Sequence, residues 1–169
     1  MPFSKRPILL GSYIAGTMLN DYEAAIILCK VGLQANPNNV VILNNLVYYQ
    51  TLSGNQENYE SNINQLAQVN LNELPDSMKI VVQATLGLVL FRNNEIDKGK
   101  ELYELAISNA EKTKNIYLKN SAILNYTREL INSNQPERIS SILTVRAMKI
   151  ENHRDLLFLK EKIIKYLAV

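Results

Sequence analysis

Apolar residues recur at three- and four-residue steps along most of this chain, which is the period of an amphipathic helix. The clearest stretch is 20–39. It opens on a turn at Asn20-Asp21, runs as a helix over 22–35, and closes around Pro37, because proline cannot continue a helix. Small residues fall on one face of this helix and let another helix approach closely: Ala25, Cys29 and Gly32.

The same period continues to the C terminus, and no stretch alternates with a period of two. Turn signals divide the chain into four helical pairs at about 7–37, 38–70, 75–111 and 115–150, and a last helix covers 153–167. The pattern therefore predicts an all-α fold in one domain. Among the residues expected to face inward are Ile42, Leu43, Leu46 and Val47, then Ile139, Leu143 and Ala147, and in the last helix Leu156, Leu159, Ile163, Ile164 and Leu167.

Several of these residues also match a known repeat. Ala25, Cys29 and Pro37 follow the A-x3-F…P pattern of the tetratricopeptide repeat (TPR), and Leu86-Gly87 with Leu90 is similar to its L-G-x2-Y element. Gly54 lies 34 residues after Asn20, which is the TPR period, and later turns at Asn94 and Asn134 follow at steps of 40. The chain thus resembles a degenerate TPR protein. The resemblance implies a right-handed α-solenoid of about four hairpins with a C-terminal capping helix.

Composition narrows the function only slightly. The 18 basic and 16 acidic residues are interspersed and leave a net charge of +2, which gives no footprint for nucleic acid. No run approaches the ~20 apolar residues of a membrane span. Lys5-Arg6 before an apolar stretch is weakly similar to a secretory signal, but Pro7 and Gly11 interrupt that stretch. Surface binding to a membrane by the last helix is a further alternative.

The residues needed for catalysis are few. With one cysteine, Cys29, and one histidine, His153, the chain makes no internal disulfide and no familiar zinc site. It has no glycine-rich phosphate loop, and Glu101 with Glu104 is typical of an exposed pair on a helix. We expect a non-enzymatic cytoplasmic protein without cofactor or metal, in which Cys29 packs in the core and His153 is exposed.

In TPR proteins the first helices of successive pairs line a concave groove that holds peptides or helices of partner proteins. The resemblance assigns a partner-binding groove to two series of positions spaced by 40 and to one further arginine: Asn45, Thr85 and Asn125, then Tyr48, Leu88 and Arg128, and Arg92. Asparagine offers a donor and an acceptor to a peptide main chain, and arginine suits a carboxylate. The alternative is that these are only exposed polar residues.

The sequence therefore predicts a scaffold or adaptor for an unidentified protein or peptide. A second hypothesis is a structural domain that associates through its first helix, either with a missing upstream domain or with a second copy in a homodimer. Leu10, Tyr13 and Ile14 would make that contact, and the short first helix is typical of the C-terminal part of a longer protein. A third hypothesis is a sensor that binds a signalling peptide in the same groove.

Overall fold

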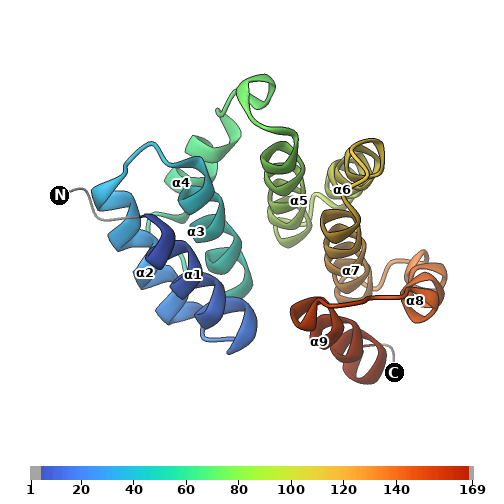
Figure 1. Cartoon of the computed structure of the whole chain (residues 1–169). Helices are drawn as coiled ribbons and strands as arrows, with labels where there is room; N and C mark the ends of the chain where they lie inside the picture. The colour runs from blue at the N-terminus through green and yellow to red at the C-terminus, as the bar shows by residue number, and fades with distance from the viewer. Residues whose placement is uncertain (1–4, 168–169) are drawn as a thin grey trace. The chain divides into compact units, whose positions relative to one another are not determined.

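The computed structural model describes residues 5–167, and in this range the protein is all-helical. It forms nine α-helices, two π-helical turns and one 3-10 turn, without a strand in the described range. The all-α fold class expected from the sequence is confirmed. The chain divides between Leu74 and Pro75 into two compact units (Figure 1).

Unit 1 precedes Pro75 and contains four α-helices, one of which continues into a π-helical turn. Its elements are α1 (Lys5–Tyr13), the π turn η1 (Ile14–Met18), α2 (Tyr22–Ala35), α3 (Val40–Ser53), α4 (Tyr59–Ala67) and the 3-10 turn η2 (Leu71–Glu73). The bounds of α2 are those expected from its flanking turns.

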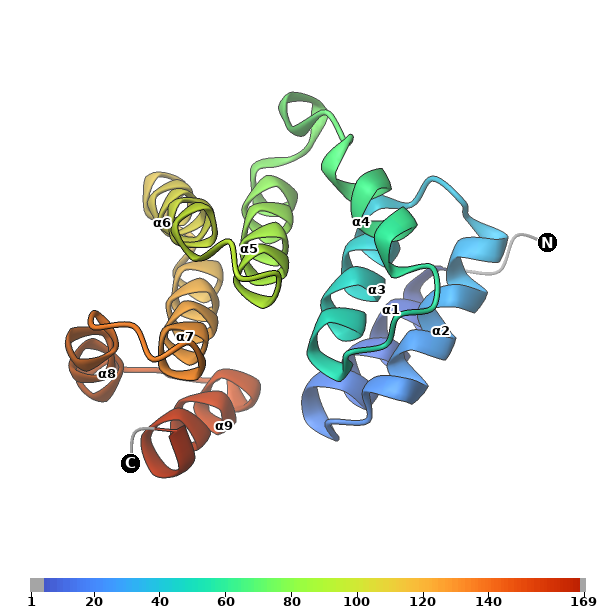
Figure 2. The ribbon, with the colours of Figure 1, turned by 180° about the vertical axis from the view of Figure 1, so that it is seen from behind.

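Unit 2 follows and contains the remaining helices. They are α5 (Asp76–Arg92), α6 (Ile96–Lys112), α7 (Ile116–Asn132), α8 (Arg138–Ala147), α9 (Arg154–Lys162) and the π turn η3 (Ile163–Leu167). Helix α7 is central in this unit: it contacts α5, α6, α8 and α9, as the view from behind also shows (Figure 2).

Three helices begin with the same capping bond, in which an Asp or Asn side chain accepts the N–H of the residue three positions later. The pairs are Asp21 with Ala24, Asn39 with Ile42, and Asn115 with Leu118, at 3.0–3.1 Å. Each bond satisfies one backbone donor that has no partner inside the helix. These caps explain why α2, α3 and α7 begin where they do.

Four helices, α3, α5, α6 and α7, end with a residue in the left-handed region. The residues are Gly54, Asn94, Lys114 and Asn134, with φ of 75°, 63°, 55° and 53°. At each end the next N–H reaches back to the carbonyl five residues earlier, as from Glu95 to Leu90 at 2.9 Å, which is a Schellman motif. Because Gly54, Asn94 and Asn134 are 40 residues apart, this motif recurs with that period.

The core of unit 1 lies between α1, α2 and α3. Ala25, Cys29 and Gly32 are buried on one face of α2, as the small-residue pattern predicts. A Cβ atom on Gly32 would stand 2.8 Å from a methyl group of Ile8. A Cβ on Gly16 of η1 would stand 2.2 Å from the Tyr49 ring, so glycine allows η1 to approach α3 closely. The four expected inward residues of α3 are also buried: Ile42, Leu43, Leu46 and Val47.

In unit 2 two glycines allow α5 and α6 to meet backbone to backbone. A Cβ on Gly87 would lie 3.2 Å from the carbonyl oxygen of Gly99, and a Cβ on Gly99 would lie 3.1 Å from that of Gly87. Beside them Phe91, Tyr103 and Tyr126 form an aromatic cluster with ring centroids 5.2–6.1 Å apart. This cluster joins α7 to the α5–α6 pair.

The expected inward stripe of α8 is wrong. Ile139 and Leu143 are both more than half exposed and Ala147 is also exposed, whereas Val145 is fully buried against Leu124. A hydroxyl contact between Ser141 and Thr127 lies on the same side as Val145. Helix α8 therefore presents the face of Ser141 and Val145 to α7.

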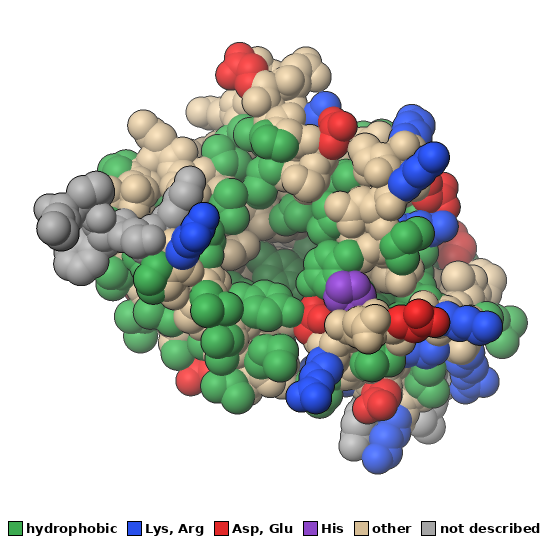
Figure 3. All heavy atoms as spheres, viewed as in Figure 1, with side chains coloured by type: hydrophobic (Ala, Val, Ile, Leu, Met, Phe, Trp, Pro, Cys, Tyr) green, Lys and Arg blue, Asp and Glu red, His purple; other side chains and the backbone are tan. Residues whose placement is uncertain are grey.

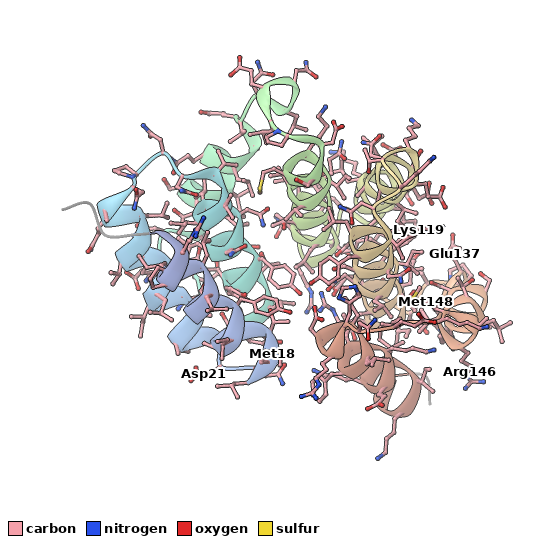
Figure 4. The ribbon with its side chains drawn as sticks, viewed as in Figure 1. Met18, Asp21, Lys119, Glu137, Arg146 and Met148 are labelled. Carbon is pink, nitrogen blue, oxygen red and sulfur yellow. The ribbon has the colours of Figure 1, made fainter. Side chains whose placement is uncertain are left out.

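The last helix packs on α7 as a cap would. Leu156 and Ile163 are buried, as expected, while Leu159 and Ile164 are half-buried and the Leu167 side chain lies outside the described residues. Lys160 Nζ donates to the carbonyl oxygens of Met148 at 2.5 Å and Arg146 at 3.3 Å, which ties α9 to the end of α8 (Figure 4 labels Met148 and Arg146).

Candidate partner-binding surfaces

In unit 1, one side of α3 remains partly open to solvent. We call it the α3 stripe: Val41, Asn45, Tyr48 and Leu52, which follow each other at steps of four, three and four residues. Val41 is exposed and the other three are half-buried, whereas nearly all other positions of α3 are buried. Two of the sequence-predicted groove residues, Asn45 and Tyr48, thus lie together on this stripe.

The surroundings of the α3 stripe hold its side chains in place. The Tyr48 ring meets the buried Tyr49 ring edge-on, with centroids 5.4 Å apart. Tyr49 in turn packs against Tyr22, and its hydroxyl lies 3.4 Å from that of Thr17. An aromatic ring braced by a second ring is a contact surface that loses little conformational freedom on binding.

Chemically the α3 stripe combines an amide and a phenol with apolar groups at both ends. An asparagine amide can both donate to and accept from a peptide main chain, and Tyr48 can contact an apolar side chain. The sequence prediction missed Val41 and Leu52, although Val41 lies four residues before Asn45 and Leu52 four residues after Tyr48, which was a usable signal.

In unit 2, two predicted groove residues on α5 are buried. Leu88 has no exposed surface and Thr85 is 3% exposed. Helix α5 is covered by both α6 and α7, so the face that carries these residues belongs to the interior of the unit. Side chains without accessible surface offer no contact to a partner, and we leave Thr85 and Leu88 out of the proposed surface.

Both predicted arginines bind the same carboxylate. Arg92 Nε on α5 lies 2.8 Å from Glu129 Oε2 on α7, and its Nη2 donates to Oε1 at 3.3 Å. Arg128 Nε donates to Glu129 Oε1 at 2.7 Å. Glu129 is 1% exposed, Arg128 is buried, and the Arg92 side chain is 38% exposed. We call this set the ion triplet.

The ion triplet joins two guanidinium groups to one carboxylate, so its formal charge is +1. A buried carboxylate loses its hydration, and only close, hydrogen-bonded cations compensate for that loss. Glu129 has such partners from its own helix and from α5. Both arginines therefore already bind a carboxylate within unit 2.

The acceptor Glu129 was not singled out from the sequence. It lies 37 residues after Arg92 and directly follows Arg128. Lys100 on α6 and Glu137, the residue before α8, are also 37 residues apart. They form a second ion pair, with 3.0 Å between Nζ and Oε1. Opposite charges 37 residues apart, found twice, were a signal for these pairings.

Asn125 on α7 is half-buried, and its Nδ2 donates to the carbonyl oxygen of Ser121 at 2.9 Å. One of its donors is thus used within its own helix, while the side chain keeps some exposed surface. Of the groove residues predicted in unit 2, Asn125 and Arg92 are those with substantial accessible surface.

Reactive chemistry has little support among the described residues. Burial raises the pKa of the Cys29 thiol to about 11, despite a hydrogen bond with Ser12, so the thiol stays protonated and unreactive in the core, as expected. His153 is exposed, as expected, and its ring lies 4.8 Å from that of Tyr117. Within residues 5–167, no group of three or more His, Cys, Asp or Glu side chains is placed to hold a metal ion.

Hydropathy adds one finding about membranes: every helix in the described range is too short or too polar to cross a lipid bilayer.

Comparisons of the chain with models of protein families, with curated proteins and with solved structures found no match.

Proposed function

We propose that this protein is a non-catalytic adaptor that binds a peptide or a helix of a partner protein on a TPR-like helical scaffold. The observation that carries the proposal is the α3 stripe, where Asn45 and the braced Tyr48 ring keep exposed surface on a helix whose other positions are mostly buried. No cofactor or metal takes part in this function.

The repeat of helix ends supports a solenoid of this kind. The Schellman motifs at Gly54, Asn94 and Asn134 recur every 40 residues, and each closes a first helix of a proposed hairpin. In a right-handed solenoid with this repeat, Asn45 and Asn125 occupy equivalent positions on first helices. We therefore propose the α3 stripe of unit 1 as the binding surface, and Arg92 and Asn125 as separate contacts of unit 2 taken by itself.

The chemistry of the α3 stripe favours a main chain with apolar side chains over a strongly charged ligand. None of its four residues carries a charge. A reducing compartment such as the cytoplasm suits the proposed adaptor, because the single cysteine has no partner for an internal disulfide.

The test is affinity capture from a cell lysate with three versions of the 169-residue chain: wild type, Asn45→Ala with Tyr48→Ala, and a control. The control, Asn64→Ala with Gln65→Ala, removes two exposed polar side chains from α4 in the same unit. A peptide from the captured protein is then titrated calorimetrically against all three. We expect the α3 double variant to bind at least about tenfold more weakly, because an anchoring tyrosine at the centre of an interface contributes about 2 kcal/mol or more.

Circular dichroism establishes that each variant keeps its helices. If the folded double variant and the control retain the same partner with the same affinity, the α3 stripe is not the binding surface and the proposal fails.

A further inference from the structure

An uncovered apolar face lies on the first helix of unit 1. We call it the N-terminal face: Leu10, Ile14 and Met18 at four-residue steps along α1 and η1, and Leu19 directly after them. These four side chains are 43–69% exposed. Hydrophobic side chains gather over α1 and η1 in the space-filling view, and Figure 4 labels Met18 at the end of η1 (Figures 3 and 4).

This face is additional to the side of the helix that packs in the core. Ser12, Ala15 and Gly16 on the opposite side are buried, and Ile8 and Leu9 pack against the core of unit 1. The inward side of α1 and η1 is thus already satisfied. Four large apolar side chains in one row are an association surface rather than scattered exposure.

We propose that the N-terminal face binds a second copy of this chain in an antiparallel, two-fold symmetric pair of α1–η1 segments. A two-fold contact requires a face that is complementary to itself. With the axis between Leu10 and Ile14, each Leu10 meets the partner's Ile14, and each Met18 lies beside the aliphatic part of the partner's Arg6 side chain.

Charge complementarity favours this occupant. Arg6, exposed at the start of α1, and Asp21, exposed just beyond η1, stand at opposite ends of the row (Asp21 is labelled in Figure 4). An antiparallel pair brings the Arg6 of each copy to the Asp21 end of the other, so two ion pairs form by symmetry. Between these ends the face carries no charged side chain that would repel its copy.

The size of the face sets the expected strength. Stable interfaces bury about 1,200–2,000 Å² in total, and four apolar side chains with one ion pair per copy lie at the small end of that range. We therefore expect a reversible dimer with a dissociation constant of about 10–500 μM.

Sedimentation equilibrium of the 169-residue chain from about 5 to 500 μM tests this expectation. The wild type should shift from monomer to dimer across the range. Leu10→Glu should raise the dissociation constant by at least about tenfold, because the new carboxylate would be buried in the apolar interface between the two copies. Ile27→Glu is the matched control: Ile27 is 60% exposed on α2, outside the N-terminal face, and its replacement should leave dimerisation unchanged.

A charge reversal tests the antiparallel arrangement. Arg6→Glu should weaken the dimer, and combining it with Asp21→Asn should restore part of the affinity, since asparagine caps a helix as well as aspartate does. A wild type that stays monomeric throughout overturns the proposal, whether the face binds a lipid or another protein. Equal effects of Leu10→Glu and Ile27→Glu, or a charge reversal without effect, would also overturn it.

Discussion

The ion triplet predicts that unit 2 loses stability when the charge of Glu129 is removed. Glu129→Gln keeps the shape of the side chain but removes the one negative charge between Arg92 and Arg128. The substitution removes the carboxylate charge that Arg128, whose side chain is 10% exposed, binds in the protein interior. We expect a large loss of stability for unit 2.

The burial of the three groups sets the magnitude. Breaking a fully buried ion pair costs about 3–5 kcal/mol. Arg92 has 38% of its side chain exposed and can return to water, so the loss lies at the lower end, about 3 kcal/mol. With a urea m-value of about 2 kcal/mol/M, the unfolding midpoint of unit 2 should fall by about 1.5 M.

Urea unfolding followed by circular dichroism at 222 nm measures this change, and amide hydrogen exchange of α7 assigns the shifted transition to unit 2. Arg92→Gln and the Arg92→Gln/Glu129→Gln pair complete a double-mutant cycle, in which the two changes should be strongly non-additive. Glu137→Gln is the control: this exposed carboxylate pairs with Lys100, and its loss should have no measurable effect. A midpoint for Glu129→Gln equal to that of the control would refute the reasoning.

Two further predictions concern a helix end and the single thiol. Lys114 occupies a left-handed position at φ 55°, so Lys114→Gly should raise the free energy of unfolding by about 1 kcal/mol, measured by the same urea titration; an unchanged or lower midpoint contradicts it. Cys29 has a folded-state pKa of about 11, raised by burial above its ordinary 9.0, so its contribution to stability is complete below pH 9 and is lost as the pH rises toward 11. Wild type should therefore lose more stability than Cys29→Ala between pH 9 and 11, and equal losses would contradict the assignment.

Most helix bounds were predictable because the turns carry strong local signals. Asn39 and Asn115 cap helices through their own side chains, and Gly54 and Asn94 tolerate the left-handed conformation that ends them. Such signals act within a few residues, so they are readable from one sequence. The small residues of α2 were equally readable, because only a close helix neighbour requires them.

The rotation of α8 was not predictable from periodicity. Ile139 and Leu143 form one apolar row at a four-residue step, and Ile142 with Val145 forms another at a three-residue step. Either row satisfies a helical pattern, and the choice depends on α7, where Leu124 packs with Val145. Packing partners far apart in the sequence decide such cases.

The groove prediction met the same difficulty. Position matching placed Thr85 and Leu88 with Asn45 and Tyr48, but α5 has neighbours on both sides and the α3 stripe does not. The arginines were expected to face a partner's carboxylate, yet an acceptor already exists in Glu129, 37 residues from Arg92. Equivalent positions in a repeat are equally accessible only when each repeat has the same neighbours.

The contact between Gly87 and Gly99 also bears on how unit 2 folds. Helices α5 and α6 are adjacent in sequence, joined by a short turn, and their backbones touch at these two glycines. Contacts between neighbours in sequence cost little loop-closure entropy and form early, so this hairpin is the natural folding nucleus of the unit. We therefore expect the slowest-exchanging amides of unit 2 to belong to this pair, and α8 and α9 to add to it afterwards.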